Sequence, residues 1–229
     1  MRILPLVVLL AGLALPAAAE PVPARITVAG EGRSFAVPDM ASLNLGVASR
    51  GLTAADALGA NSTALASVLA RLAADGIAPR DIQTSGLSVG PRYDYSDNGD
   101  GRVVGYDARN MVTVRVRDLP ALGALIDAAF AAGANEFNGL SFGLADDRAA
   151  IDAARRAAVA DARARADLYA KAAGVSLGRI VTISETTGFE APQPMALRAD
   201  SIAAPAPVPV AAGELSLGAQ ITMVFEIVQ

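Results

Sequence analysis

Every second residue from Leu215 to Ile227 is apolar, in the run Leu-Ser-Leu-Gly-Ala-Gln-Ile-Thr-Met-Val-Phe-Glu-Ile. Successive side chains of a β-strand point to opposite faces, so this alternation predicts a strand with one buried and one exposed face. Sheets with one solvated face are mostly antiparallel. Shorter alternating runs occur at 42–47 and 112–117, and residues 26–35 and 179–185 also look extended. We therefore expect a largely antiparallel sheet.

Three helical patterns lie between these runs. The first, at about 53–75, begins with a capping box of Thr53 and Asp56 and ends at Gly76. The second is expected to begin with Asp118 as its N-cap and to stop at Gly133. The third spans roughly 147–173. Its buried face is expected to comprise Ile151, Ala154, Ala158, Ala162, Leu168 and Tyr169, and its exposed ion pairs Asp152–Arg156, Asp161–Arg165 and Asp167–Lys171.

These patterns predict an α+β fold in one domain, with a mostly antiparallel sheet and the three helices packed on one face. The expected order is strand, strand, helix, strand, strand, helix, strand, helix, strand, strand. Residues 93–106 contain the turn cluster 97–101 and should form a hairpin. Residues 188–213 are rich in proline and alanine and should form a long extended loop.

The beginning of the chain is typical of a secretory signal. Arg2 precedes an apolar stretch from Ile3 to Leu15, and Ala17-Ala18-Ala19 fits a cleavage site, so the mature chain is expected to be 20–229. The apolar stretch is too short to span a bilayer, and no later run predicts a membrane span. We expect a periplasmic protein, with association with the outer membrane left open.

The composition narrows the chemistry. The chain contains no histidine and no cysteine, which removes the commonest general base, the best thiol nucleophile and any disulfide. The net charge of −4 becomes −5 when Arg2 is removed with the signal. The chain therefore has no overall positive electrostatic potential that would attract nucleic acid. We expect no cofactor, no metal site and no enzymatic activity.

Several motifs allow two interpretations. Residues 30–35 begin like a dinucleotide-binding loop, but Phe35 replaces the last glycine, and a glycine bulge near a sheet edge is favoured. Residues 94–99 resemble the start of a calcium loop, but position twelve is Gly105, so a hairpin turn is favoured. Asp146 and Asp147 could form a carboxylate pair, although helix capping is the favoured role.

Arginines on adjoining strands could form a local basic face. The favoured alternative is that they make cross-strand pairs with Asp94, Asp107 and Asp118. The arginines concerned are Arg92, Arg102, Arg109, Arg115 and Arg117.

The chain also resembles the bacterial SIMPL-domain family, including its periplasmic immunogenic type. The resemblance covers almost the whole chain after the signal. It implies an exported α+β protein without established catalytic residues and with a loose link to envelope or oxidative stress. The matching segments are 26–32, 38–41, 76–77, 81–84, 105–110, 114–119, 133–135, 140–142 and 158–163.

The function that we expect is that of a non-enzymatic periplasmic structural or interaction protein that assembles with copies of itself. Three of the four tyrosines, Tyr93, Tyr95 and Tyr106, lie on the predicted hairpin, and amphipathic aromatic side chains favour interfaces. The expected partners are further copies of the chain, forming a homo-oligomer, and another envelope protein. A binding protein for a small ligand or an extended peptide is the alternative, and a hydrolase using serine and acidic residues is a third.

Overall fold

The computed structural model describes residues 24–95, 101–186, 193–194 and 210–228, so the expected signal, residues 97–100 of the expected turn and most of 188–213 lie outside it. Apart from the two-residue strand β7, the order of elements is the expected one. The elements are β1 (Arg25–Ala36), β2 (Met40–Gly51), α1 (Ala54–Ala74), β3 (Ile82–Asp94), β4 (Arg102–Val116), α2 (Leu122–Ala131), β5 (Glu136–Gly143), α3 (Arg148–Ala172), β6 (Ser176–Glu185), β7 (Gln193–Pro194) and β8 (Leu215–Val228), with 3-10 turns at Pro79–Asp81 and Leu119–Ala121.

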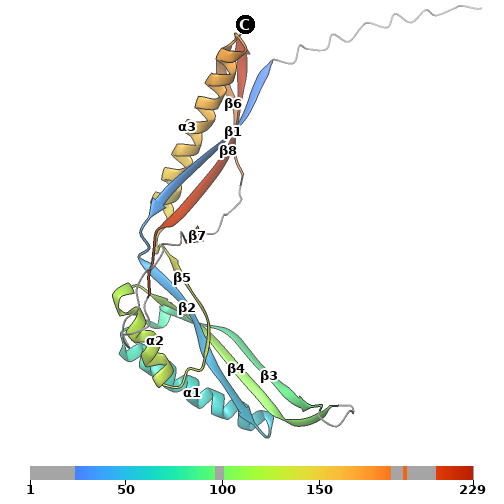
Figure 1. Ribbon diagram of the computed structural model, residues 1–229, viewed down its shortest axis with the longest axis vertical. Coiled ribbons are helices and arrows are strands. Elements are labelled where there is room, and N and C mark those ends of the chain that lie inside the picture. The colour runs from blue at the N-terminus through green and yellow to red at the C-terminus, as the bar shows by residue number, and fades with distance from the viewer. Residues whose placement is uncertain (1–23, 96–100, 187–192, 195–209, 229) are drawn as a thin grey trace, which may run out of the picture.

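The strands form two antiparallel sheets, one in each half of an elongated molecule (Figure 1). The upper sheet has the order β1-β8-β6, with β7 also beside β8, and α3 packs on it. The lower sheet has the order β3-β4-β2-β5 and carries α1 and α2. The α+β class is confirmed, but the strands do not share one sheet. The link 37–39 carries the chain from the upper sheet into the lower one, because β1 pairs with β8 and β2 pairs with β4 and β5.

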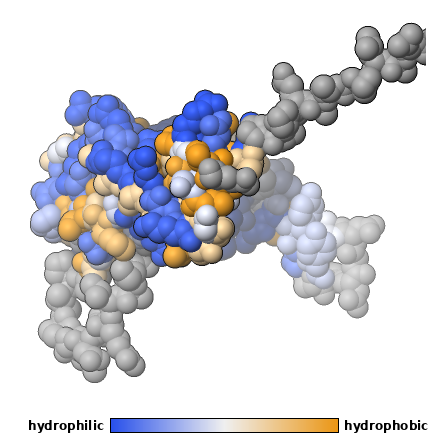
Figure 2. All heavy atoms as spheres, turned by 90° about the horizontal axis from the view of Figure 1, so that it is seen from above, coloured by the Kyte–Doolittle hydropathy of each residue, from blue (hydrophilic) through white to orange (hydrophobic). Residues whose placement is uncertain are grey.

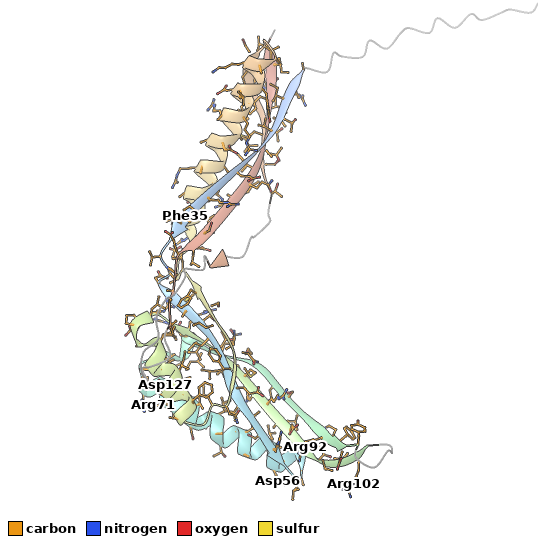
Figure 3. All side chains as sticks on the ribbon, viewed as in Figure 1. Phe35, Asp56, Arg71, Arg92, Arg102 and Asp127 are labelled. Carbon is orange, nitrogen blue, oxygen red and sulfur yellow. The ribbon has the colours of Figure 1, made fainter. Side chains whose placement is uncertain are left out.

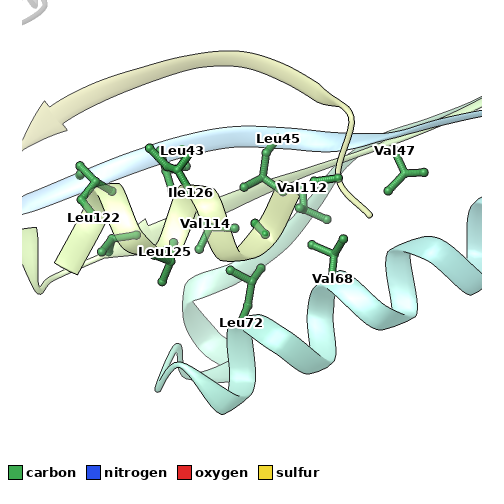
Figure 4. Packing of buried hydrophobic residues seen from close by; sticks show 14 of the residues in the cluster. Leu43, Leu45, Val47, Val68, Leu72, Val112, Val114, Leu122, Leu125 and Ile126 are labelled. Carbon is green, nitrogen blue, oxygen red and sulfur yellow. The ribbon is translucent and has the colours of Figure 1, made fainter. Parts of the chain in front are cut away.

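The core of the lower half lies between the sheet and its two helices. Figure 4 shows Val68 and Leu72 of α1 and Leu122 of α2 in one cluster with Leu45 and Val114 of the sheet. Burying an aliphatic side chain of this size contributes about 1.5–3 kcal/mol. Alternation in β2 and β4 therefore has the expected result, with one face buried and the other open.

The upper half depends on small residues. Alanines at every fourth position of α3 are buried, at Ala154, Ala158, Ala162, Ala166 and Ala170. They meet two glycines of β1. A Cβ atom on Gly30 would lie 2.6 Å from the Cβ atom of Ala162, and one on Gly32 would overlap the backbone of Ala154 and Ala158. These glycines therefore allow α3 to lie directly on β1.

Three expectations about this region are wrong. Strand β1 pairs with β8 from Arg25 to Ala36 without a register shift, so residues 30–35 contain no bulge. Leu168 and Tyr169 are exposed, because the buried stripe is made of alanines alone. Among the ion pairs, Asp161–Arg165 is present, while Asp152 pairs with Arg155 in place of Arg156.

The glycine stops predicted at Gly76 and Gly133 are confirmed, and the third helix ends in the same way at Gly174. Gly76, Gly133 and Gly174 have positive φ angles. Each following N–H donates back across the last turn, in the bonds Ile77–Leu72, Ala134–Ala129 and Val175–Ala170, at 3.0–3.1 Å. This is the Schellman arrangement, which turns the chain out of a helix toward the next strand.

The helix starts differ from one another. The capping box of Thr53 and Asp56 is confirmed. The side chain of Asp118 makes no capping bond, because the chain enters α2 through a 3-10 turn, so this expectation is wrong. At α3, Asp147 makes no capping bond, whereas Asp146 Oδ1 accepts a hydrogen bond from the N–H of Arg148 at 3.1 Å.

Candidate functional site

The β3–β4 hairpin belongs to the lower half, and its free end lies at the lower right of Figure 1. Figure 3 places Arg92 and Arg102 toward its free end. Tyr93 and Tyr95 are 47% and 68% exposed, and their ring centroids lie 6.1 Å apart. Tyr106 is only half-buried and lies further along β4, opposite Pro91 and Gly51. The structure therefore brings two of the three predicted tyrosines together.

An apolar stripe continues from these rings along β3. The register places Val89 opposite Ala108 and Leu87 opposite Asn110. Ala108 is fully buried on the face that carries α1, and opposed residues share a face. Leu87 and Val89 therefore lie on the helix-bearing side, yet they are 60% and 40% exposed. Helix α1 therefore covers this part of the outer strand incompletely.

Large hydrophobic side chains are also exposed elsewhere on the molecule, but here Leu87, Val89, Tyr93 and Tyr95 follow one another along β3 and the residue just beyond its end. In the view of Figure 2, the surface is mainly hydrophilic, with hydrophobic residues gathered in separate patches. Aromatic and aliphatic side chains that are exposed together favour contacts with another protein. The hairpin end and the adjoining part of β3 therefore form a candidate interaction surface.

A second candidate site is a groove of about 480 Å³ on the lower sheet. Strand β2 runs beyond the beginning of β5 there, and the side chain of Asn135 takes the place of a strand. Its Nδ2 donates to the carbonyl of Ala48 at 2.8 Å, and its Oδ1 accepts from the N–H of Ala48 at 2.7 Å. The lining residues are Ala48, Ser49, Arg50, Asp107, Arg109, Asn135 and Glu136.

The charges of this groove are paired. Arg109 Nε lies 3.2 Å from Glu136, and Arg50 Nε lies 3.5 Å from Asp107. The guanidinium groups are largely exposed and can still bind a carboxylate, while the two acids can accept hydrogen bonds from an ammonium group. The groove can therefore hold a small ligand that carries both charges.

Three members of the predicted cross-strand pairs, Asp107, Arg109 and Arg117, have partners other than the expected ones. Asp107 pairs with Arg50, and Arg109 pairs with Glu136. Arg117 donates to the buried carboxylate of Asp81 at 3.0 Å. This hydrogen bond lowers the pKa of Asp81, although burial acts in the opposite direction. This pairing stabilises the fold beside the turn before β3.

The acidic pair before α3 is a helix-terminal feature. Arg148 donates to the Asp146 carboxylate through its side chain and its backbone N–H, which lowers the pKa of Asp146 to about 2. Such an acid stays ionised and is a poor general acid at neutral pH. Within the described ranges, no group of three or more acidic residues could hold a metal ion.

The sequence could not reveal the groove, because it depends on which strands pair. Asn135 follows a glycine stop, and only the pairing of β2 with β5 brings it next to Ala48.

The part of the chain that the structure describes contains no helix that is both long and apolar enough to cross a bilayer.

Comparison with known proteins gives a consistent result. Residues 26–225 match the model of the SIMPL family, described as a protein of unknown function (DUF541). The chain is 42% identical over 213 residues to the 26 kDa periplasmic immunogenic protein of Brucella melitensis and to that of Brucella abortus, covering 90% of this chain and 85% of each relative. It is 30% identical over 220 residues to the uncharacterized protein YggE of Escherichia coli K12, covering 95% and 89%.

Proposed function

The chain belongs to the SIMPL family, and from this premise we propose that it is a non-enzymatic structural or interaction protein of the periplasm that assembles with copies of itself. The periplasm is the compartment in the name of the Brucella relatives. It also agrees with the secretory signal expected at 1–19.

The observation that carries this proposal is the exposed end of the β3–β4 hairpin. Tyr93 and Tyr95 present two neighbouring rings beside the apolar stripe of Leu87 and Val89. A tyrosine ring provides a large contact area at a small cost in side-chain entropy, and its hydroxyl can remain hydrogen-bonded. Another envelope protein is a second proposed partner, and it would bind through the same exposed surface. A role in envelope or oxidative stress would operate through such contacts, since the chain has no thiol.

The test is the double substitution Tyr93→Ser and Tyr95→Ser, followed by sedimentation velocity over a range of concentrations. Loss of two interface aromatics typically costs about 2 kcal/mol or more, so the dissociation constant should rise about thirtyfold. Tyr169→Ser is the matched control, because Tyr169 is also exposed but lies on α3, away from the hairpin. Equal behaviour of the two variants would refute a role for the hairpin.

Binding of an amino acid or a short peptide is the second candidate function. The groove favours it, because two arginines and two carboxylates line one cavity at the open end of β2. Titration calorimetry with a dipeptide panel tests it. Binding should be lost in Arg109→Gln and retained in Arg156→Gln, whose exposed arginine lies on α3. An absence of heat with every dipeptide would remove this candidate.

A further inference from the structure

Strand β3 has a free outer edge. It pairs with β4 alone, and no side chain among the described residues hydrogen-bonds to the backbone of 86–90. The outer strand β1 is protected, because Asp161 of α3 accepts a hydrogen bond from the N–H of Glu31 at 2.9 Å. Ser34 also donates to the carbonyl of Ala150 at 2.7 Å. An unprotected edge is a template for pairing with another strand.

The contacts of Asn135 establish which peptide groups of β3 face outward. Both backbone groups of Ala48 bind Asn135, so they point away from β4. Arg109 of β4 lies opposite Ala48, and in an antiparallel pair two opposed residues either both point their backbone groups at each other or both point them away. The N–H and C=O groups of Arg109 therefore point away from β2 and toward Ser88 of β3. Ser88 is hydrogen-bonded into the sheet. Its neighbours Leu87 and Val89 consequently direct their N–H and C=O groups into solvent.

The exposed segment has a symmetric sequence. Residues 86–90 are Gly-Leu-Ser-Val-Gly, in which glycine, an apolar residue and a central serine are mirrored. If two copies meet antiparallel with Ser88 on a two-fold axis, Leu87 of one lies opposite Val89 of the other. Those two residues can then exchange both of their outward hydrogen bonds. Gly86 lies opposite Gly90 of the second copy, where no side chain obstructs the approach.

The surroundings of this segment select one register. A register shift lies between Thr84 and Gly86 at one end, and Pro91 lacks an N–H at the other, so regular pairing is confined to 86–90. No charged residue lies between these limits, so two copies can approach without like-charge repulsion. Leu87 and Val89 would cover each other beside α1.

We propose that two copies join through β3 in this register, so that their lower sheets form one continuous sheet. This rests on the proposed self-assembly and specifies the contact that performs it. The contact is isologous, since each copy contributes the same residues. A foreign peptide would use the same free edge but would not require a symmetric sequence, which is why a second copy is the favoured occupant.

Disulfide trapping tests the register, because the chain has no cysteine of its own. In the proposed dimer the two Ser88 residues form a non-hydrogen-bonded pair with Cα atoms about 4.5 Å apart, within the range for a disulfide. The mature Ser88→Cys chain should become a covalent dimer under mild oxidation and should revert with reductant. Gln83→Cys is the control, since the two exposed positions would lie about 30 Å apart and should stay unlinked.

A second pair of substitutions separates this contact from other assembly. Leu87→Lys adds a charge at the edge and should abolish cross-linking of Ser88→Cys, whereas Leu168→Lys alters an equally exposed leucine on α3 and should not. Circular dichroism checks that both variants fold. If the protein is an oligomer but Ser88→Cys does not cross-link, or if Gln83→Cys cross-links equally well, only the proposed β3 contact is refuted. A monomer at all concentrations overturns the proposed self-assembly as well.

Discussion

Gly30 shows how one residue can control the packing of a whole layer. Its buried α-carbon faces Ala158 and Ala162, where a side chain would collide with the helix backbone. The sequence analysis favours a bulge here, but glycines in a strand also occur where another backbone approaches closely. Distinguishing a bulge from close packing requires the position of α3, which begins more than a hundred residues later in the chain.

Gly30→Ala is therefore expected to destabilise the protein by about 1–3 kcal/mol, because the added methyl group must push α3 away from β1. Gly59→Ala is the matched control. Gly59 lies in α1, where an added Cβ atom would have no neighbour within 4 Å, so alanine should stabilise the helix by about 0.5–1 kcal/mol. Denaturant unfolding measures both, and equal effects would contradict the close packing.

Asp146 provides a prediction about pH. Its pKa in the folded protein is about 2, below the ordinary value of 3.8, because Arg148 donates to it. A lowered pKa contributes stability that is present above pH 3.8 and is lost as the pH falls through about 2. NMR titration of the Asp146 carboxyl group should give the low midpoint, Arg148→Gln should raise it, and Arg156→Gln should leave it unchanged. An ordinary midpoint in the unmodified chain would show that the pair does not persist in solution.

At the scale of elements, the helix starts provide a direct comparison. Thr53 accepts a hydrogen bond from the N–H of Asp56 at 3.1 Å, whereas Asp118 makes no capping bond. Thr53→Ala should cost about 0.5–2 kcal/mol of stability. Asp118→Ala should cost much less, although both residues look like N-caps in the sequence. Thermal unfolding distinguishes them, and a larger loss for Asp118→Ala would contradict the assignment.

Elements were more predictable than the contacts between them. Apolar spacing and the glycine stops at Gly76, Gly133 and Gly174 predict the helices and strands in the correct order, because these signals are local. The division into two sheets depends on long-range pairing, such as β1 with β8, which alternation does not encode. The hairpin tyrosines were predictable for the same local reason. The groove was not, since Asn135 reaches Ala48 only through tertiary structure.

At the scale of the whole molecule, each half has its own core and the two are connected at a narrow region. Asp39 Oδ1 accepts a hydrogen bond from the N–H of Ala145 at 2.7 Å, and the N–H of Asp39 donates to Gly143 at 3.2 Å. Val210 packs against the lower core before the chain enters β8 in the upper sheet. Phe35 lies exposed in the same region (Figure 3). Such an extended shape leaves the β3–β4 hairpin accessible to other molecules.

The most direct test of self-assembly is native mass spectrometry of the mature chain purified from the periplasm, since it reports subunit number and bound species together. The account predicts a multiple of the subunit mass with no added non-protein mass. This assembly should dissociate when Tyr93 and Tyr95 are replaced by serine. A single subunit that carries a tightly bound small molecule would contradict the account and would favour the groove as the functional site.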